Sequence, residues 1–430
     1  MDIRRDKYLN KLIIRKHNGM VKIITGLRRS GKSYLLNVFF YQHLLSCGVD
    51  ETHIIKFAFD SADDLAIIGE DLVELKKQKK KVDPNKFMEY IKDRLLDNEQ
   101  YYFLLDEIQE LDAFESVLNG YLRKGNIDIY VTGSNSKFLS SDILTEFEDR
   151  GDEIHVFPLI FSEYYNAFSF SKEEAFEMYS VYGGLPLQAM MSTDSQKTKY
   201  LNSLIEKTYL KDIIDRNDLK SDNDIGELLD VVASGIGGLV STSKLESTFK
   251  SMKKSGITRA TIDKYVGFFK DSFLISQSLR YDIKGRKYIG APYKLYFEDI
   301  GLRNARIGFR QIESNHIMEN IIYNELRYRG FNVDVGVVES REMKDGIVER
   351  TNYEVDFVAT LGSKKYYIQS AYEISDEEKW DKETKSFDKI DDSFKKIVVV
   401  KNPVVPRHDE KGYLIIGIFD FLLDDSSLEK

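Results

Sequence analysis

The chain has 430 residues, which exceeds the size of one compact core, so at about 150 residues per domain we expect two to four domains. Its 62 lysine and arginine residues stand against 71 aspartate and glutamate residues, and the net charge of −9 argues against a protein that coats nucleic acid with its whole surface. A hydrophobic fraction of 42% excludes a disordered chain.

The cysteine and histidine content and the length of the apolar runs further limit the classes of protein to which the chain can belong. Cys47 is the only cysteine in the sequence, so neither an intrachain disulfide nor a thiolate zinc site can form. The six histidines are scattered, and the N-terminus has no apolar core of the signal-peptide type. No apolar run approaches the roughly 18–20 residues that span a bilayer. We therefore expect a soluble, cytoplasmic protein without a membrane segment.

A phosphate-binding loop is the first motif along the chain. The apolar run VKIIT (21–25) is typical of a strand, GLRRSGKS follows at 26–33, and a helical pattern begins at Tyr34. Glycines let backbone N–H groups approach a phosphate, and a helix N-terminus attracts anions. We expect Lys32 to reach the β and γ phosphates and Ser33 to bind Mg²⁺. The predicted nucleotide-binding residues are Gly26, Arg29, Ser30, Gly31, Lys32, Ser33 and Tyr34.

A pair of acids after a second apolar run supplies the metal side of this site. The run YYFLL (101–105) is typical of a buried parallel strand, and Asp106 and Glu107 follow at its carboxyl end. We expect Asp106 to bind Mg²⁺ and Glu107 to polarise the attacking water. Alone, two such acids fit a helix N-cap equally well, but the upstream phosphate loop favours an ATPase. The guanine-reading sequence [NT]-K-x-D does not occur, so ATP is the expected nucleotide.

Two further positions are candidates for catalysis. The segment DIYVTGSNS (128–136) predicts a strand, after which Asn135, or Ser134, would orient the water; an ordinary turn is the alternative. Arg150 precedes a strand at 153–157, where an arginine can act on the nucleotide of a neighbouring copy. Such a role implies a homo-oligomer. A surface arginine paired with a nearby acid is the alternative for Arg150.

In this order, the motifs resemble those of an AAA+ ATPase domain over residues 20–190. The sequences VFPLIFSEYY (156–165) and YGGLP (182–186) are similar to those of a bacterial and archaeal group within that class. Its members join the ATPase to a winged helix and to a C-terminal domain of unknown function with a restriction-endonuclease-like core. The resemblance spans nearly the whole chain and implies ATP binding and hydrolysis with Mg²⁺.

A helix-turn-helix pattern with a hairpin follows the ATPase region. Helices are predicted at 224–238, 242–251 and 259–275, and alternating runs at 278–289 surround the turn residues Lys284 and Gly285. Together they predict a winged helix. The segment 239–290 carries a net charge of +7, which leaves −16 for the rest of the chain. This basic segment fits contact with a DNA backbone; a winged helix that packs within the chain is the alternative.

The last part of the chain has the layout of a nuclease but lacks part of its chemistry. A helix and three strands are predicted at 316–331, 353–359, 364–374 and 395–402. In restriction-type nucleases two acids bind Mg²⁺ and a lysine activates water. Glu319 and Asp356 fit two acids, but Gln369 stands where another acid belongs and Ala371 where the lysine belongs. We therefore expect a nuclease-shaped body without metal-dependent cleavage, used for binding or docking.

The expected architecture is α/β, with a parallel sheet of strands at 21–25, 53–59, 101–105, 128–132 and 153–157 flanked by helices. The expected parts are a P-loop ATPase core (1–160), a helical lid (161–220), a winged helix-like part (221–308) and a catalytically inactive restriction-endonuclease-like domain (309–430).

The leading functional hypothesis is an ATP hydrolase that couples its nucleotide state to the winged helix and the nuclease-like body. The alternative is a nucleotide-dependent switch with little turnover that binds DNA or protein. A place in defence or in a toxin–antitoxin system rests on family analogy alone.

Overall fold

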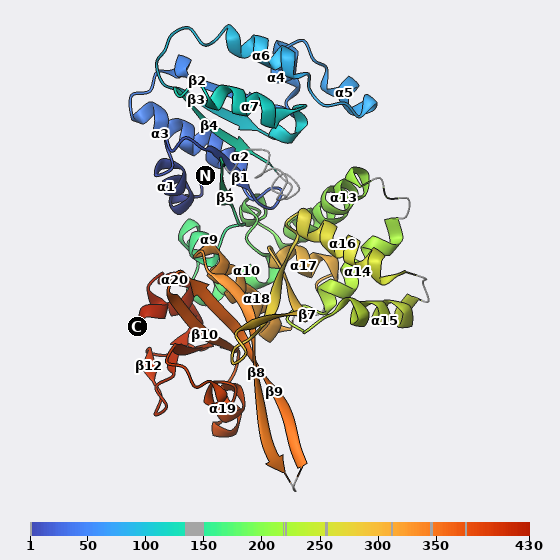
Figure 1. The fold of residues 1–430 in the computed structure, drawn as a ribbon, viewed down its shortest axis with the longest axis vertical. Coiled ribbons are helices and arrows are strands. Elements are labelled where there is room, and N and C mark those ends of the chain that lie inside the picture. The colour runs from blue at the N-terminus through green and yellow to red at the C-terminus, as the bar shows by residue number, and fades with distance from the viewer. Residues whose placement is uncertain are drawn as a thin grey trace. The chain divides into compact units, whose positions relative to one another are not determined.

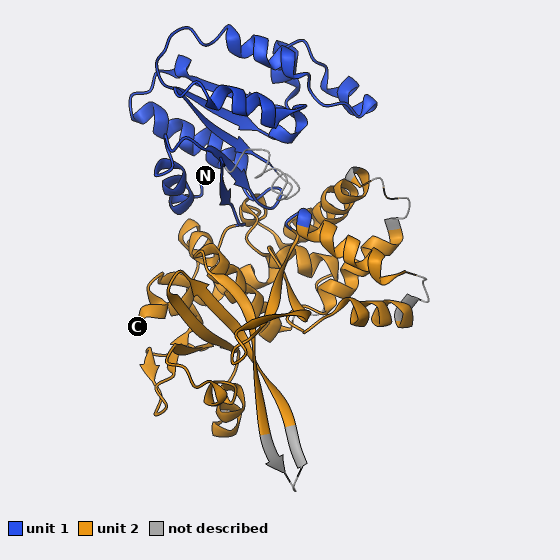
Figure 2. Cartoon of the chain, in the orientation of Figure 1, with its two compact units in different colours: residues 1–158, 271–273 blue, residues 159–270, 274–430 orange. Residues whose placement is uncertain are grey.

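A computed structural model describes residues 2–133, 150–217, 219, 222–253, 257–310, 313–344, 347–374 and 376–430. The chain divides into two compact units, which Figure 2 shows in different colours. The first unit comprises residues 1–158 with 271–273, and the second comprises residues 159–270 with 274–430. Among the described residues, no helix combines the length and the apolar character needed to cross a bilayer.

The first unit is built on a five-stranded sheet whose neighbouring strands all run parallel (Figure 1). The strands are β1 (Val21–Thr25), β2 (Ile54–Ala58), β3 (Tyr101–Asp106), β4 (Ile127–Thr132) and β5 (Gly151–His155), in the order β2-β3-β4-β1-β5. β1, β3 and β4 are buried along their whole length, which explains why most of their residues are apolar. The predicted parallel sheet is confirmed, and the fold is that of an AAA+ P-loop α/β domain.

Helices cover both faces of this sheet. They are α1 (Asp6–Ile13), α2 (Lys32–Tyr34), η1 (Leu35–Phe40), α3 (Tyr41–Ser46), η2 (Glu51–His53), α4 (Ala62–Ile67), α5 (Leu72–Gln78), α6 (Pro84–Lys92), η3 (Ile108–Glu110) and α7 (Phe114–Leu122). Phe57 of β2 packs on Phe87 of α6 on one face, with ring centroids 5.3 Å apart. Tyr130 of β4 packs on Phe40 on the other face at 4.4 Å. Because side chains alternate along strands, both faces are apolar.

The second unit begins with helices. They are α9 (Phe161–Ala167), α10 (Lys172–Tyr182), α11 (Pro186–Ala189), α12 (Asp194–Leu204), η5 (Ile205–Leu210), α13 (Lys211–Arg216), α14 (Asp222–Ser234), α15 (Thr242–Lys253), α16 (Arg259–Asp271), α17 (Ile300–Arg306) and α18 (Ser314–Tyr328). Later in the chain come α19 (Glu377–Thr384), η6 (Phe387–Lys389), α20 (Ile418–Leu423) and η7 (Ser427–Glu429). α14, α15 and α16 supply the helices expected at 224–275.

An eight-stranded mixed sheet forms the rest of the second unit. Its strands are β6 (Ile275–Asp282), β7 (Lys287–Phe297), β8 (Asn332–Lys344), β9 (Ile347–Leu361), β10 (Lys364–Ala371), β11 (Lys395–Val400), β12 (Arg407–His408) and β13 (Leu414–Gly417). Their order is β12-β13-β11-β10-β9-β8-β6-β7. β10 pairs in parallel with β11 and antiparallel with β9.

The structure differs from a self-contained winged helix in the place of the hairpin. β6 and β7 pair with each other, as expected, but β6 also pairs in parallel with β8, from Arg280 opposite Val335 to Asp282 opposite Val337. The hairpin is therefore part of the same sheet as β9, β10 and β11, the strands for which a nuclease-like domain was predicted. Sequence patterns could not show this, because the two paired segments lie about fifty residues apart and each has its own alternation.

Candidate nucleotide-binding site

The loop after β1 closes around the ammonium group of Lys32. Lys32 is buried, and its Nζ donates hydrogen bonds to the carbonyl oxygens of Gly26 at 2.9 Å and Leu27 at 3.0 Å. The hydroxyl of Ser30 is also buried, and no residue in the described part of the chain forms a hydrogen bond with it. The backbone of the loop surrounds the ammonium group of Lys32, and the hydroxyl of Ser30 lies in the same loop. This arrangement fits the phosphates of a nucleotide, whose oxygens would replace the two carbonyl oxygens as partners of the ammonium group.

Gly26 is required where the loop begins. Its φ is +130°, and a Cβ placed on it would lie 2.2 Å from the carbonyl oxygen of Val156. Val156 is held there because its N–H donates to the oxygen of Thr25 at 2.8 Å. No side chain fits between these backbones, so the glycine sets the path of the loop.

Arg5 supports the loop and was missed by the sequence analysis. Its guanidinium donates to the carbonyl oxygen of Ser30 at 3.0 Å and to that of Phe157 at 2.7 Å. Arg5 is buried, and Tyr8 of α1 accepts the N–H of Phe157 at 3.0 Å. The N-terminal segment thereby ties the phosphate loop to the chain after β5. A lone arginine ahead of a helix carries no sequence signal for this role.

The carboxylate of Asp106 lies beside Ser33, and both were predicted as Mg²⁺ ligands. The hydroxyl of Ser33 donates to Asp106 Oδ1 at 3.0 Å, the Thr132 hydroxyl donates to the same oxygen, and Asn37 Nδ2 lies 3.5 Å from Oδ2. Burial raises the pKa of Asp106, while the hydrogen bonds from Thr132 and Ser33 act to lower it. A serine hydroxyl and a carboxylate are the hard oxygen ligands that Mg²⁺ takes together with phosphate oxygens. These two residues fit the ion.

Glu107 follows Asp106 in a left-handed backbone conformation, with φ of +50°. Its N–H donates to the hydroxyl of Thr132 at 3.0 Å, and its carboxylate accepts a hydrogen bond from Gln109. Burial and the charge of Glu107 raise the pKa of Asp60, which follows β2 at the same end of the sheet. Thr132 and Asp60 were not singled out from the sequence. Their signal was the position of each just at or after the end of a predicted strand.

The other predicted nucleotide contacts lie at the edge of the loop or away from it. Arg29 is exposed, with φ of +69°, and Tyr34 is exposed and donates its hydroxyl hydrogen to Asp2. Asn135 and Ser134 lie outside the described residues.

The backbone of Arg150 lies at the end of β1 and β5 opposite to the end from which the phosphate loop leaves. Its carbonyl oxygen accepts the N–H of Val21, the first residue of β1, at 2.8 Å, whereas the loop follows the last residue, Thr25. The structure therefore does not bring Arg150 to the nucleotide site of its own chain.

The YGGLP sequence is anchored inside the second unit by Asp299. The carboxylate of Asp299 accepts the N–H groups of Gly184 at 2.8 Å and of Leu302 at 3.0 Å. A Cβ on Gly183 would lie 2.4 Å from this carboxylate, and one on Gly184 would lie 2.0 Å from the oxygen of Leu159. Burial raises the pKa of Asp299 to about 6, although these backbone donors act to lower it. The two glycines are thus explained by close packing against Asp299 and Leu159.

The predicted nuclease-like acids meet around a lysine from β7. Lys294 Nζ lies 2.8 Å from Glu319 Oε1 and 3.5 Å from Asp356 Oδ1. Gln369 is bound to the backbone, because its Oε1 accepts the N–H of Asp356 at 2.7 Å, and Ala371 is buried. The sequence analysis missed Lys294, which precedes these acids in the chain and belongs to no motif.

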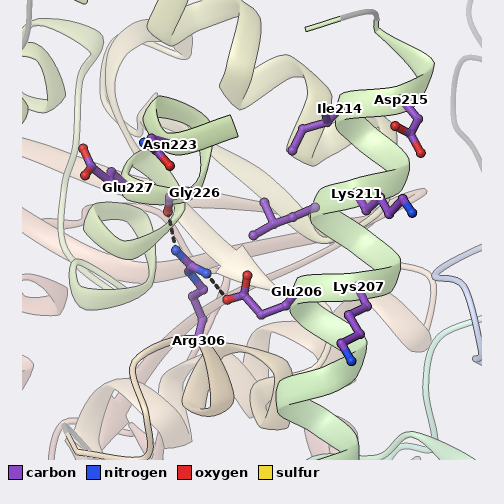
Figure 3. Close-up of a pocket in the computed structure, with 10 residues that line it drawn as sticks. Glu206, Lys207, Lys211, Ile214, Asp215, Asn223, Gly226, Glu227 and Arg306 are labelled. Atoms are coloured by element: carbon purple, nitrogen blue, oxygen red, sulfur yellow. Dashed lines mark hydrogen bonds and ion pairs between the residues drawn. The ribbon is translucent and has the colours of Figure 1, made fainter. Parts of the chain in front are cut away.

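A cavity of 510 Å³ lies elsewhere in the second unit, between α13 and α14 (Figure 3). Figure 3 shows the guanidinium of Arg306 directed to Glu206 and to the carbonyl oxygen of Gly226, and Arg306 is also paired with Asp230 at 2.7 Å. Glu206, Gly226 and Asp230 thus engage the guanidinium of Arg306 within the second unit. The lining residues are Glu206, Lys207, Leu210, Lys211, Ile214, Asp215, Asn223, Gly226, Glu227 and Arg306.

Two solved structures match the chain at low similarity. An ORC1 protein from Aeropyrum pernix in complex with DNA is 13% identical, with 71% of this chain and 92% of that chain covered and a TM-score of 0.29. A Cdc6p from Pyrobaculum aerophilum is 12% identical, with 74% and 95% covered and a TM-score of 0.31.

Comparison with family models and with curated proteins shows which family the chain belongs to. Residues 18–165 match the model of an AAA domain, and residues 173–313 match a domain of unknown function. An uncharacterized protein of Methanocaldococcus jannaschii is 25% identical over 405 residues, which cover 90% of this chain and 82% of that protein. An uncharacterized protein of Haemophilus influenzae is 30% identical over 427 residues, 98% of either chain. The chain therefore belongs to the same family as the Haemophilus influenzae protein, and its AAA domain is a P-loop NTPase fold of the nucleotide-binding type.

Proposed function

We propose that the protein hydrolyses ATP with Mg²⁺. The observation that carries this proposal is the network at the carboxyl ends of three strands. Ser33 follows β1, Asp106 ends β3, and Thr132 ends β4 and connects Asp106 to the backbone of Glu107. A cytoplasmic location, where ATP and Mg²⁺ are supplied, goes with this proposal.

We assign a separate role in hydrolysis to each residue of the proposed site. Lys32 stabilises negative charge on the β and γ phosphates, and the backbone of the loop orients them. Ser33 and Asp106 would hold Mg²⁺, which supplies charge neutralisation between the two phosphates. Glu107 accepts a proton from the attacking water, and the hydrogen bond from Gln109 holds its carboxylate in place. Asn135 is proposed as the residue that orients this water.

The test separates binding from hydrolysis. Lys32→Ala should lose ATP binding, whereas Glu107→Gln should bind ATP and lose turnover by about 10²-fold or more. Glu99→Gln is the matched control, because Glu99 is exposed and precedes the first residue of β3, whereas Glu107 follows the last. Turnover by Glu107→Gln at the rate of the control would remove the role assigned to Glu107. Turnover absent from the wild type would favour the alternative, a nucleotide-dependent binding switch.

We also propose DNA contact through the winged helix-like part, supported by the charge of +7 over residues 239–290. Some of this charge is paired internally, since Glu246 binds both Lys250 and Arg259 at 2.7 Å. Other cations are exposed, including Lys264 on α16 and Arg286 between β6 and β7. Backbone contact needs exposed cations and no base-reading side chain. The nuclease-like strands are proposed as a binding or docking body without Mg²⁺-dependent cleavage.

Homo-oligomerisation is the remaining part of the proposal. Because the backbone of Arg150 lies at the strand end opposite to its own phosphate loop, we propose that a catalytic role requires the nucleotide of a second copy. Arg150→Ala should then lower turnover only under conditions in which the protein self-associates. Measurement of turnover against protein concentration, with mass determined by light scattering, tests this. Equal turnover of Arg150→Ala and wild type at every concentration would exclude the role.

A further inference from the structure

A cavity of 340 Å³ in the second unit has one apolar and one polar part. It is lined by α10, by the start of α18 and by the residues that directly follow β10 and β11. Its volume lies within the roughly 300–1,000 Å³ of small-molecule sites in proteins. Such sites combine apolar walls with a few polar groups that fix the orientation of the ligand. We therefore ask which ligand the groups in this cavity fit.

The apolar part of the cavity is formed by side chains from two helices. Phe176 of α10 and Ile317 and Met318 of α18 line it, and all three are buried. Phe176 also packs against Phe419 of α20, with ring centroids 5.8 Å apart. Because these side chains belong to the core of the unit, the apolar wall exists before any ligand binds. It fits the hydrocarbon part of a small molecule.

The polar part of the cavity is centred on Lys401 and Tyr372. Lys401 follows β11 and is exposed, and its Nζ lies 4.6 Å from the centre of the Tyr372 ring. Within the described ranges of the chain, no carboxylate forms an ion pair with Lys401. The third polar residue, Ser314, begins α18, a helix of 15 residues whose N-terminus carries partial positive charge. An ammonium group and a phenol hydroxyl thus lie together at one end of the cavity.

The electrostatic field at the phenol of Tyr372 is positive. Burial acts to raise the pKa of Tyr372, but hydrogen bonds from Lys401 and Ser314, together with the charge of Lys401, outweigh it and lower the pKa. Two acids lie on this side of the unit: Glu177, which lines the cavity and is exposed, and Glu373, whose charge acts to raise the pKa of Tyr372. Since the pKa is nevertheless lowered, Lys401 outweighs Glu373 at this position, and the polar part of the cavity favours an anion.

A buried hydroxyl on α10 lacks a partner in the same cavity. The Oγ atom of Ser180 is buried, and no residue in the part of the chain that the structure describes forms a hydrogen bond with it. The carbonyl oxygen of Ser180, by contrast, accepts a hydrogen bond from Asn304 Nδ2 at 2.9 Å, which fixes the helix at this place. Buried polar atoms in proteins nearly always have a hydrogen-bond partner. A ligand with acceptor oxygens would supply one.

We propose that this cavity binds a small organic anion with an apolar body, of the class of medium-chain carboxylates. The ammonium group of Lys401 and the hydroxyl of Tyr372 bind the anionic group, the hydroxyl of Ser180 donates a further hydrogen bond, and the apolar wall takes the hydrocarbon body. All of these groups belong to the second unit. The inference rests neither on ATP hydrolysis nor on DNA contact.

The experiment uses anilinonaphthalene sulfonate as the probe, because it joins an anionic group to an aromatic body and fluoresces when it leaves water. The full-length, nucleotide-free protein should bind the probe at this cavity, and octanoate should displace it. Octylamine is the matched competitor, since it has a chain of the same length and the opposite charge, and it should not displace the probe. Absence of binding by the wild type, or displacement by octylamine equal to that by octanoate, would overturn the proposal.

Two variants test the charge at the polar part of the cavity. Lys401→Met should weaken binding of the probe about tenfold, because it removes the ammonium group, and it should fold because Lys401 is exposed. Glu177→Gln should strengthen binding, because it removes a negative charge from the lining. Lys385→Met is the matched control: Lys385 is also exposed, and its Nζ lies 5.4 Å from the centre of the Tyr353 ring, away from this cavity. Equal affinity of Lys401→Met and Lys385→Met would contradict the proposal.

Ser180→Ala separates a ligand-binding hydroxyl from a structural one. The variant should bind the probe about threefold more weakly than the wild type, because one hydrogen bond to the anion is lost. Its melting temperature should not fall, because no described residue forms a hydrogen bond with the hydroxyl. The opposite result, a lower melting temperature with unchanged binding of the probe, would show that the hydroxyl stabilises the fold and would contradict its assignment to the ligand.

Discussion

Ser33 and Asp106 lie 73 positions apart in the chain, yet the hydroxyl of Ser33 donates a hydrogen bond of 3.0 Å to the carboxylate of Asp106. Thr132 donates to the same carboxylate and accepts the N–H of Glu107. One threonine therefore positions both acids of the proposed catalytic site. This position makes Thr132 a sharper probe of the site than either acid, because its substitution changes no charge.

Thr132→Val should lower ATP turnover by on the order of 10- to 100-fold while ATP binding is retained, because Glu107 loses the bond that fixes its backbone. Leaving the N–H of Glu107 without a partner should also cost about 1–3 kcal/mol of unfolding free energy. Steady-state kinetics and chemical denaturation measure the two effects. Thr132→Ser keeps the hydroxyl and should turn over at nearly the wild-type rate. Loss of activity in Thr132→Ser as large as in Thr132→Val would contradict the assigned role.

Gly26→Ala should abolish ATP binding and cost on the order of 3 kcal/mol of stability, because its Cβ would lie 2.2 Å from the oxygen of Val156. Gly125→Ala is the matched control, since Gly125 also has a positive φ, +76°, but has nothing within 4 Å of its Cβ position. The control should lose only about 1–2 kcal/mol from backbone strain and should bind ATP. Thermal unfolding and nucleotide titration distinguish the two, and equal losses would show that strain, not the close approach, decides.

The pH dependence of stability should carry a contribution from Asp299. Its pKa is raised from 3.8 to about 6 in the folded protein, so the folded state binds more protons than the unfolded state between these values. Stability from this group therefore grows as the pH falls from about 6 to about 4, by at most about 1 kcal/mol per pH unit. Asp299→Asn should flatten that slope, whereas Asn at the exposed Asp391 should not. Identical slopes in urea denaturation of wild type and Asp299→Asn would refute this.

DNA binding should depend steeply on salt if the exposed cations of the winged helix-like part contact phosphates. Lys264→Ala and Arg286→Ala should each reduce the slope of log affinity against log salt by about 1. Lys172→Ala, an exposed lysine of α10 outside this part, is the control of equal charge and should leave the slope unchanged. Fluorescence anisotropy with duplex DNA measures the slopes. A wild-type affinity that does not change with salt would reassign these helices to packing within the chain.

Local signals in the sequence were sufficient to predict the parallel sheet and to single out Ser33 and Asp106 as candidate residues. The buried strands β1, β3 and β4 are mostly apolar runs, and Gly26, Lys32 and Ser33 belong to one short motif whose spacing is set by phosphate chemistry. The expected order of strand, loop and acid therefore needed no knowledge of distant contacts.

Contacts between distant segments could not be read in this way. Lys294 reaches Glu319 and Asp356, and Asp299 binds Gly184, across 25 to 115 positions of the chain. A lysine within a strand, such as Lys294, or an aspartate before a helix, such as Asp299, is ordinary in sequence, and only the fold selects its partner. The same holds for Arg5, whose partners Ser30 and Phe157 are backbone carbonyls that leave no trace in residue type.

The parallel pairing of β6 with β8 has a consequence for dissecting the protein into fragments. A piece that begins at residue 309 would lose β6 and β7, leave the backbone of β8 as an open edge available for aggregation, and strip Glu319 and Asp356 of the ammonium group between them. A piece that ends at residue 308 would carry a hairpin without its neighbouring strand. We therefore expect neither fragment of the second unit, the one before residue 309 or the one from residue 309 onward, to fold stably when it is expressed without the other.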